Sequence, residues 1–537
     1  MRRALTSFAV IFLVAALIFP NIVSRLTVAG FLRIPVEGAV VIALMLVLPR
    51  RGRRIAAVVL GVLVGWLVVE KCLDMGFFQE LNRPFDPVLD WVLFDDGYNF
   101  VVDSYGRVAA VGAVPAVLLL VASVMALTVW SLLRVGALIG RYRRRSLFTA
   151  GGVAVAWGVT FALGVSITGG VPVAARSTAT YAWDRAHQAR AGLRDSAAFA
   201  SEVRTDAYGG TPAQQMLTAL RGKDVVFTFV ESYGRSAVEH PALAPAIDPV
   251  LDQSSALLRQ AGFASRSGWL TSPTFGGGSW LAHSTFESGL WINNEQRYRN
   301  LVSSDRLTMT RAFHDAGWRT VSVMPGTTGA WPEGRFYGYD AVWDSRNLGY
   351  QGPKFSWAPM PDQYTLKQLN TIEYKKPGRG PLMIEMPLVS SHTPWAPIPS
   401  YLPDWNQVGD GSIYQAMVTD GKKPKALWAN PRDVRPEYGK SIQYSITSLV
   451  NWIRLYGDDN LVMVFLGDHQ PSPIAAGANA SHDVPISIVA KDPAVLSRIA
   501  GWGWQDGLRP TSATPVWPMS MFRDKFFSAF GPGTPAS

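Results

Sequence analysis

Five apolar runs crowd into the first 170 residues of the chain, and this feature constrains the fold more than any other. No run beyond that point approaches the roughly 20 residues that a helix needs to cross a bilayer. The mean hydropathy of +0.12 is also high for a purely soluble protein. We therefore predict an α-helical membrane domain with five spans, at residues 5–23, about 34–49, 55–69, about 108–133 and 148–167.

Clusters of arginine predict the orientation of these spans, because Lys and Arg in short loops are held on the cytoplasmic side. The clusters lie at the N-terminus, at residues 50–54 and at residues 141–145, whereas the loop at 71–107 is acidic and aromatic. A cleaved signal peptide is the alternative for the first run, but "FPNIV" offers no small-residue cleavage site. The pattern indicates a multi-pass protein with its N-terminus inside and everything after residue 170 outside.

The net charge of +10 follows mostly from these topological arginines. The distal region has no stripe of basic and aromatic residues, so we expect no nucleic-acid partner. Cys72 is the only cysteine, which excludes an intramolecular disulfide. The exported part of the chain must therefore be stable through its core alone.

The composition divides the chain into four parts. We assign residues 1–170 to the membrane domain, 171–222 to an amphipathic helical linker, 223–525 to a catalytic domain and 526–537 to a disordered tail. The linker is mixed in charge and rich in alanine. A solvated tether is an equally good interpretation of its sequence.

The distal region alternates short β-type runs with helical stretches. Near-continuous apolar runs of this kind are typical of strands that are buried on both faces of a mostly parallel sheet. We predict an α/β fold whose ligands gather at the carboxyl ends of the strands. The predicted strands are 223–232, 319–326, 381–392, 459–469 and 484–491, and two of the predicted helices are 248–262 and 437–457.

Polar residues follow three of these strands. Glu231 follows the first, Asp468 and His469 follow the fourth, and His392 follows the third. A single acid after a strand is usually a helix cap or a solvated loop residue. Carboxylates together with an imidazole instead indicate a site for a divalent ion such as Mn²⁺ or Zn²⁺.

The stretch "TSPTFGGGSW" places Ser279 after three glycines and at the start of a predicted helix. Glycines before a helix let backbone N–H groups approach a phosphate, and the helix N-terminus favours an anion. A serine hydroxyl attacks only when it is activated, and a bound cation favours its ionised form. Ser279 is therefore predicted to be both the fourth metal ligand and the nucleophile, although a turn with an N-cap serine would give the same local sequence.

These motifs resemble the lipoteichoic acid synthase-like phosphoglycerol transferases of the alkaline phosphatase and sulfatase superfamily. The resemblance covers nearly the whole chain and implies five spans, a helical linker and an extracytoplasmic sulfatase-like domain. It implies one divalent ion, Mn²⁺ before Zn²⁺ or Mg²⁺. The ligands that it implies are Glu231, Ser279, Asp468 and His469.

The same resemblance implies substrate contacts. His392 lies in "SSHTPW", which matches the family's His-x-Pro motif, and Trp331 lies where the family has a tryptophan beside the phosphoglycerol group. Arg335 matches the neighbouring arginine with a different spacing. His482 is a plausible neighbour of His392, and His283 would lie one turn after Ser279, although a loop role and a packing role are the respective alternatives.

The chain also departs from its relatives in this family. It has serine where the synthases have threonine, and "GDHQP" where "GDHG" is commoner. The sulfatase branch needs a Cys or Ser in a C/S-x-P-x-R signature, and "SPTFGGG" lacks the arginine. The phosphoethanolamine-transferase branch commonly carries disulfides, which this chain cannot form.

The predicted function is a membrane-anchored transferase on the outer face of a bacterial cytoplasmic membrane. It would move a head group from a phosphatidylglycerol-like phospholipid to a glycan or glycolipid acceptor through a covalent seryl intermediate. The alternatives are a hydrolase of the same superfamily, a phosphoethanolamine transferase, and an inactive membrane sensor or anchor. The complete ligand set argues against the last of these.

The arginine pattern makes a testable prediction about topology. We expect a phosphatase reporter joined after about residue 200 to be active and one joined at about residue 52 to be inactive, because only the first would be exported. Reporter activity in intact cells is the measurement. The reverse pattern would show that the orientation is wrong.

Overall fold

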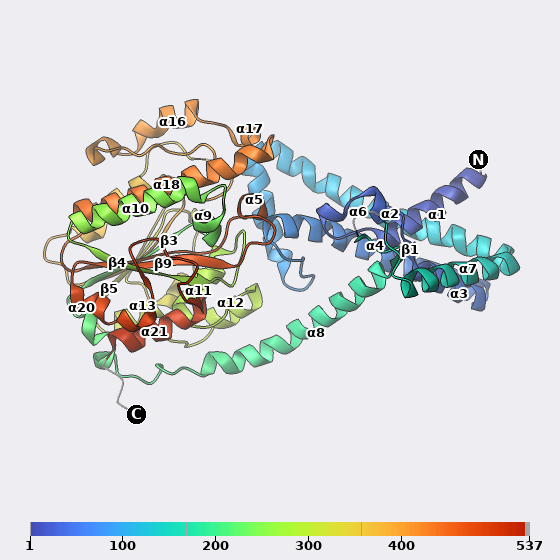
Figure 1. Ribbon diagram of the computed structural model, residues 1–537, viewed down its shortest axis with the longest axis horizontal. Coiled ribbons are helices and arrows are strands. Elements are labelled where there is room, and N and C mark those ends of the chain that lie inside the picture. The colour runs from blue at the N-terminus through green and yellow to red at the C-terminus, as the bar shows by residue number, and fades with distance from the viewer. Residues whose placement is uncertain (1, 168–169, 356, 532–537) are drawn as a thin grey trace. The chain divides into compact units, whose positions relative to one another are not determined.

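The computed structural model describes residues 2–167, 170–355 and 357–531. The chain forms two compact units, which are described separately (Figure 1). The first comprises Met1–Gln79 and Arg83–Asp195, and the second comprises Glu80–Asn82 and Ser196–Ser537. The boundary falls inside helix α8 (Ser177–Arg204), so the first part of the predicted linker is one long helix that starts in the first unit.

Helices occupy all five predicted spans, but only two are long and apolar enough to cross a membrane among the described residues, namely α4 (Arg50–Glu80) and α6 (Arg107–Arg141). Helices α1 (Arg2–Ile18) and α3 (Val36–Val47) have 17 and 12 residues, fewer than the roughly 20 that a span needs. Helix α7 (Arg143–Ala162) occupies the fifth predicted span. The structure thus gives two candidate spans, and five remains a prediction.

Buried charged groups join α8 to α4 within the first unit. Lys71 Nζ donates to Thr178 Oγ1 at 3.0 Å, and Arg185 lies 3.7 Å from Asp74. Buried charges are tolerated when they are paired in this way. The unit also contains α2 (Val28–Phe31), α5 (Leu93–Tyr105) and a short parallel pairing of β1 (Ile34–Pro35) with β2 (Ala174–Ala175).

The second unit is built on one nine-stranded sheet with the order β10-β4-β9-β8-β3-β7-β5-β6, in which β11 also pairs with β4. The five strands predicted from apolar runs are confirmed as β3 (Asp224–Val230), β5 (Arg319–Met324), β7 (Leu382–Leu388), β8 (Leu461–Gly467) and β9 (Asp483–Ala490). Every residue of β3, β8 and β9 is buried, as continuous apolar runs require. The other strands are β4 (Ala264–Thr271), β6 (Ala341–Asp344), β10 (Gln505–Asp506) and β11 (Val516–Pro518).

Helices cover both faces of this sheet, which makes the unit an α/β sandwich (Figure 1). One core contains α10 (Ala244–Gln260) and α18 (Pro431–Tyr456), which confirm the two predicted helices, and the other contains α11 (Ser279–Ser288), α13 (Met309–Asp315), α20 (Pro493–Ser497) and α21 (Phe522–Phe530). The remaining helices are α9 (Arg235–Glu239), α12 (Glu295–Val302), α14 (Gly334–Tyr337), α15 (Asp362–Leu369), α16 (Gln415–Asp420), α17 (Pro424–Trp428) and α19 (Pro473–Ala476).

The sheet is mixed, and this corrects the expectation for β9. Strand β9 runs antiparallel to both β8 and β4, whereas β3, β5, β6, β7 and β8 are parallel to one another. A buried strand is a continuous apolar run whether it is parallel or antiparallel to its neighbours, so the sequence of β9 did not reveal its antiparallel direction. Because of the reversal, the start of β9 lies at the edge where the parallel strands end.

The predicted disordered tail is also corrected. Phe526 and Phe530 lie in α21 and are fully buried, so the folded domain continues past residue 525. The ring of Phe526 contacts those of Phe227 and Phe530 in the core. Residues 532–537 of the predicted tail lie outside the described residues.

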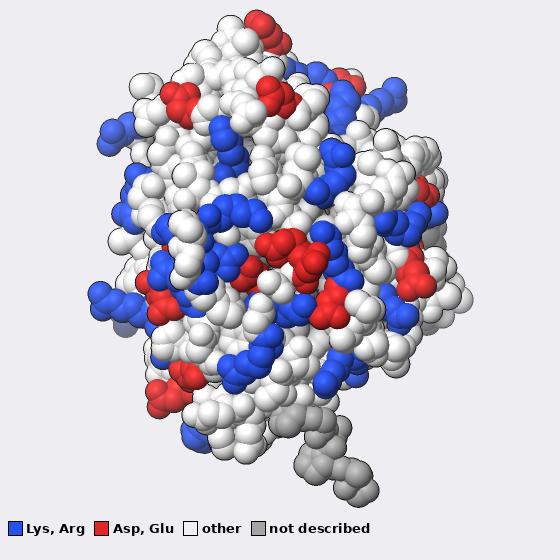
Figure 2. Space-filling model, turned by 90° about the vertical axis from the view of Figure 1, so that its left-hand side faces the viewer, with Lys and Arg blue, Asp and Glu red and all other residues white. Residues whose placement is uncertain are grey.

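One face of the molecule carries charges of both signs (Figure 2). Lys and Arg side chains alternate there with Asp and Glu, and acidic side chains gather near the middle. A nucleic-acid-binding surface would instead present a basic patch or stripe. The described residues of this face present no such patch or stripe (Figure 2).

The buried position of α21 predicts how two changes near the C-terminus affect stability. We expect Phe526→Ala to lower the free energy of unfolding by about 3–5 kcal/mol, because it leaves a cavity between the sheet and α21. Thermal unfolding of the full chain in detergent measures the change. Ending the chain after residue 531 is the control and should be neutral; equal stability of Phe526→Ala and the parent would contradict the placement of α21.

Candidate metal and nucleophile site

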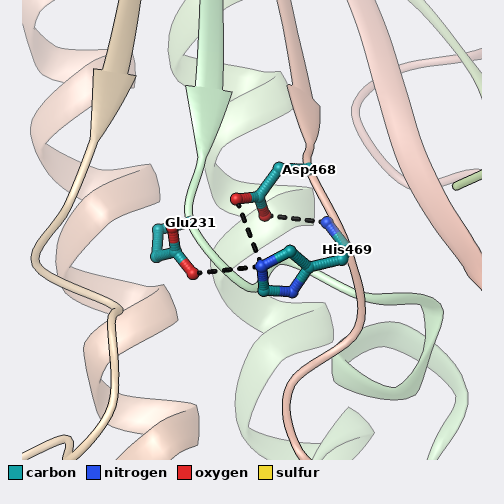
Figure 3. A group of neighbouring side chains, drawn as sticks. All are labelled: Glu231, Asp468 and His469. Carbon is teal, nitrogen blue, oxygen red and sulfur yellow. Dashed lines mark hydrogen bonds and ion pairs between the residues drawn. The ribbon is translucent and has the colours of Figure 1, made fainter. Parts of the chain in front are cut away.

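The predicted carboxylate and imidazole ligands converge at the carboxyl edge of the sheet. Glu231 follows β3, and Asp468 and His469 follow β8, which pairs with β3 in parallel. Parallel neighbours end at the same edge, so these side chains meet. One ligand atom from each lies within 4.8 Å of the others (Figure 3).

Backbone groups orient the ligand atoms. Asp468 Oδ1 accepts the N–H groups of Ser232 and His469, each at 2.8 Å, and Oδ2 lies 3.5 Å from His469 Nε2. His469 Nδ1 lies 2.8 Å from the carbonyl oxygen of Gln470. A carbonyl can only accept, so Nδ1 carries the proton and Nε2 keeps the lone pair that a metal would use.

The cluster carries an excess of buried negative charge. Burial and, to a smaller extent, the neighbouring charge of Glu231 raise the pKa of Asp468 to about 6. Burial lowers the pKa of His469, but Asp468 and Glu231 outweigh this and raise it above its usual value. Two buried carboxylates that share one imidazole are poorly neutralised, so the donor set fits a divalent cation.

Ser279 is the first residue of α11 and points at the same cluster. Its Oγ lies 3.1 Å from Glu231 Oε2 and 3.2 Å from His469 Nε2. The preceding Gly278 has φ of +80°, a left-handed conformation that glycine adopts without strain. The glycine loop is held to the metal side of the site, because Gly276 N–H donates to Gln470 O at 2.9 Å. The structure thus brings all four predicted ligands together.

His392 lies in the turn after β7 and is half-buried. Its ring stacks on Trp357 with centroids 3.7 Å apart, and Nδ1 lies 2.5 Å from the carbonyl oxygen of Thr393. Burial lowers its pKa to about 4 with a smaller contribution from His469, which places His392 within electrostatic reach of the cluster. Asp362 fixes the turn by accepting the backbone N–H groups of Val389 and Ser390.

The other two predicted histidines also lie near the cluster. His482 precedes β9, its carbonyl accepts from Ser272 N–H at 2.9 Å, and burial lowers its pKa. His283 stacks on Phe229 with centroids 3.8 Å apart, and burial lowers its pKa to about 4. Its Nε2 is buried and has no hydrogen-bond partner among the described residues.

Trp331 and Arg335 lie in different environments. Trp331 is half-buried with its ring centroid 5.7 Å from that of Tyr337, whose hydroxyl lies 2.7 Å from Ser284 Oγ on α11. The loop with Trp331 is therefore connected to α11, the helix that begins with Ser279. Arg335 is exposed on α14, and none of the described contacts brings its side chain to the metal cluster.

Comparisons with known proteins agree with this architecture. Residues 252–486 match the protein-family model described as Sulfatase. The match identifies residues 252–486 as part of a sulfatase-like domain. The match includes Ser279, His392, Asp468 and His469, whereas Glu231 precedes the matched residues. No curated protein matches the sequence.

Several solved structures are similar to the chain. The lipoteichoic acid synthase LtaP from Listeria monocytogenes is 14% identical, with 64% of this chain and 78% of LtaP covered and a TM-score of 0.39. The phosphoglycerol transferase GacH from Streptococcus pyogenes, in complex with sn-glycerol-1-phosphate, is 11% identical, with 62% and 91% covered and a TM-score of 0.36. The phosphoethanolamine transferase EptA from Neisseria meningitidis is 13% identical, with 98% and 95% covered and a TM-score of 0.45.

Sequence reasoning missed a pair of buried acidic residues, Glu287 on α11 and Glu385 on β7. Glu385 on β7 lies 3.6 Å from His283 and accepts a hydrogen bond from the hydroxyl of Tyr339. Burial and, to a smaller extent, the nearby charge of Glu287 raise the pKa of Glu385 well above its usual value, and burial also raises the pKa of Glu287. A lone glutamate inside the apolar run "PLMIEMPLVSSH" was the available signal.

The ligand geometry predicts the effect of removing one carboxylate. Asp468→Asn should weaken binding of Mn²⁺ or Zn²⁺ by at least about 100-fold, because an amide lacks the charge that a divalent ion needs. Metal titration of the purified chain is the measurement. The control is Asp224→Asn, which removes a buried carboxylate at the amino end of β3 and should retain the metal. Equal metal retention by the Asp468 and Asp224 variants would overturn the assignment.

Metal affinity should also depend on pH. With the pKa of Asp468 raised to about 6, a proton competes with the metal below that pH. We expect the affinity to be full above about pH 7 and to fall progressively as the pH drops through 6. An affinity that stays constant from pH 7 to 5 would show that Asp468 is not a ligand.

Proposed function

We propose that the chain is a membrane-anchored, metal-dependent transferase. It moves a phosphoglycerol-type head group from a phosphatidylglycerol-like phospholipid to an extracytoplasmic glycan or glycolipid acceptor. The observation that carries the proposal is the Ser279 hydroxyl, which lies at the start of α11 within hydrogen-bond distance of both Glu231 and His469. A hydroxyl in this place is suited to nucleophilic attack on a phosphodiester.

The proposed reaction has two displacements at phosphorus. In the first, Ser279 Oγ loses its proton and bonds to the head-group phosphorus, the bond to the diacylglycerol oxygen breaks, and that oxygen takes up a proton. In the second, an acceptor hydroxyl bonds to the phosphorus, and Ser279 leaves and regains a proton. A divalent ion bound by Glu231, Asp468, His469 and Ser279, which we propose to be Mn²⁺, would stabilise the ionised hydroxyl and the phosphodiester charge.

His392 is proposed to contact the transferring phosphate or the oxygens that enter and leave. Its lowered pKa keeps the imidazole neutral, and the contact of Nδ1 with the Thr393 carbonyl leaves Nε2 to exchange a proton. Trp331 and Arg335 are proposed to bind the head group. His482 and His283 are proposed to border it, with the unpartnered Nε2 of His283 as the supporting observation.

The membrane part of the proposal rests on α4 and α6 and on the arginine pattern. We propose that the first unit contains five spans, that the N-terminus is cytoplasmic, and that the sulfatase-family domain lies outside the cytoplasmic membrane. The phospholipid donor would then be available on the side where the domain lies.

A covalent adduct tests the proposed function. We expect the purified chain with Mn²⁺ and fluorescent phosphatidylglycerol to release labelled diacylglycerol and to carry a head-group phosphate on Ser279, which peptide mass spectrometry locates. Ser279→Ala should abolish turnover without loss of the fold, and Ser279→Thr should keep part of it because a hydroxyl remains. An adduct on Ser272, Thr274 or Ser284 instead would overturn the assignment.

The same assay separates the proposed function from its alternatives. A glycan adduct of the head group indicates a transferase, whereas a free head-group phosphate without acceptor indicates a hydrolase. Turnover of phosphatidylethanolamine but not phosphatidylglycerol would indicate a phosphoethanolamine transferase. The absence of any metal-dependent product from either lipid would favour an inactive anchor.

The role of His392 makes a separate prediction. His392→Ala should lower the turnover rate by about 10² to 10⁴, which is the usual contribution of a positioned acid or base, and leave metal content unchanged. Turnover and elemental analysis are measured on the same preparation. Activity within a few-fold of the parent would remove His392 from the mechanism.

A further inference from the structure

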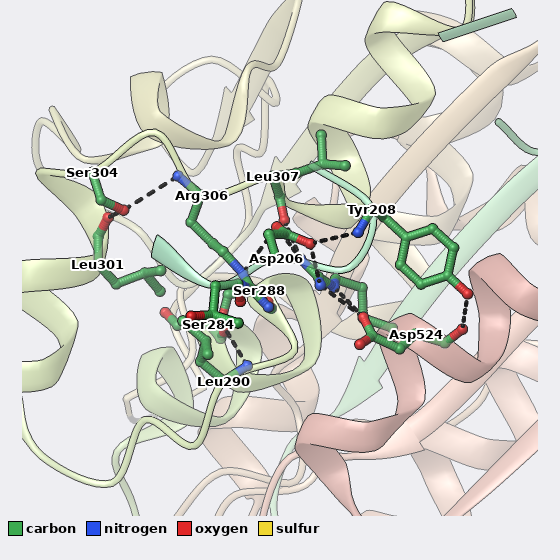
Figure 4. Close-up of polar contacts among 12 residues, drawn as sticks. Asp206, Tyr208, Ser284, Ser288, Leu290, Leu301, Ser304, Arg306, Leu307 and Asp524 are labelled. Carbon is green, nitrogen blue, oxygen red and sulfur yellow. Dashed lines mark hydrogen bonds and ion pairs between the residues drawn. The ribbon is translucent and has the colours of Figure 1, made fainter. Parts of the chain in front are cut away.

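The end of the nucleophile helix opposite Ser279 abuts two buried arginines. Arg306 Nε donates to the carbonyl oxygen of Ser288, the last residue of α11, at 2.9 Å (Figure 4). Gly289 follows with φ of +69°, and a Cβ there would lie 2.7 Å from Arg523 Nε. The guanidinium of Arg523 therefore packs directly on the C-cap of the helix.

Asp206 pairs with both arginines, and Arg523 also pairs with Asp524, its Nη2 lying 2.7 Å from Asp524 Oδ1. Arg523 donates through two nitrogens to Asp206 at 2.9 and 3.0 Å, and Arg306 Nε lies 3.2 Å from the same carboxylate. The side chains of Arg306 and Arg523 are only 3% and 0% exposed. Burial raises the pKa of Asp206, but the contact with Arg523 outweighs it, so the pKa lies below its usual value.

Asp206 belongs to the segment that leads from α8 to the sheet. It lies two residues after the end of α8, and the carbonyl of the intervening Thr205 accepts from Arg306 Nη1 at 2.6 Å. Tyr208 fixes the same segment, since its N–H donates to Asp206 Oδ1 at 3.0 Å and its hydroxyl to Asp524 O at 3.3 Å. The linker therefore contributes a side chain to the interior of the second unit.

These contacts hold the C-terminal end of α11 and therefore affect the direction of the helix axis. The last carbonyls of a helix carry partial negative charge, and cations stabilise them. Two guanidinium groups in this interior would be costly without carboxylates, and Asp206 is the one carboxylate that pairs with both, while Asp524 pairs with Arg523. Helix α11 has ten residues and is about 15 Å long, so a shift at its end moves the hydroxyl at its start.

We infer that Asp206, Arg306 and Arg523, here called the α11 clamp, position Ser279 against Glu231 and His469 by fixing the far end of α11. They are positioning residues, because they touch the helix and not the reacting atoms. The inference rests on the proposed role of Ser279 as nucleophile. It assigns to the segment after α8 a part in the transfer reaction that a plain tether would not have.

Asp206→Asn tests the clamp, because it keeps the shape of the side chain and removes its charge. The matched control is Asp224→Asn, which breaks another buried carboxylate–arginine pair, with Arg379 at 2.6 and 2.7 Å, at the opposite edge of the sheet. Both variants of the full chain are loaded with Mn²⁺ and assayed well below their melting temperatures. The readouts are metal affinity, the single-turnover rate of adduct formation on Ser279, and hydrogen exchange of the α11 amides.

We expect Asp206→Asn to slow adduct formation by about 10- to 100-fold, as a misplaced nucleophile does, while metal affinity stays unchanged. Asp224→Asn should stay within about twofold of the parent, and Asp206→Glu should recover part of the rate. The amides of residues 279–288 should exchange faster in Asp206→Asn than in Asp224→Asn. Should Asp206→Asn fail to fold, Arg306→Lys makes the same test, because it keeps the charge and loses the paired contacts.

Equal adduct rates and equal α11 exchange in the Asp206 and Asp224 variants would overturn the clamp and leave Asp206 a purely structural residue. A parent that forms no adduct on Ser279 would refute the proposed nucleophile. In that case the exchange measurement still decides whether Asp206 holds α11, so the two failures are distinguishable.

Discussion

The excess of negative charge where β3 and β8 end is the constraint on which the rest of the site depends. The carboxylates of Glu231 and Asp468 are buried beside each other and share the imidazole of His469. Burial and the like charges make this arrangement unfavourable unless a cation neutralises them. The parallel pairing of the two strands forces this proximity. Backbone N–H groups donate to Asp468 and a backbone carbonyl accepts from His469, and these contacts orient both side chains.

Helix α11 links this cluster to the remainder of the second unit. Its start holds Ser279 against Glu231, its middle packs on Phe229 through His283, and its end abuts two arginines. The side chain of Asp206 ties that end to the segment after α8. In this account α11 is in contact with the proposed metal site at its start and with the segment after α8 at its end, and the loop proposed to bind the head group packs beside it.

Much of this arrangement could be predicted from the sequence. Strands buried on both faces read as continuous apolar runs, and polar residues just after them must gather at one edge, which is why Glu231, Asp468 and His469 were found. The direction of β9 could not be read, since a buried run is symmetric, and β4 was missed because serines interrupt it at Ser265 and Ser267. The α11 clamp could not be predicted from the sequence, because Asp206 and Arg523 are separated by 317 residues.

The central claim is that the carboxyl edge of β3 and β8 binds one divalent ion between Glu231, Asp468, His469 and Ser279. Anomalous diffraction from crystals of the Mn²⁺-loaded full chain tests it most directly. The account predicts one strong peak within about 2.3 Å of an oxygen or nitrogen atom of all four residues. A peak elsewhere, or one that Ser279 does not reach, would contradict the account.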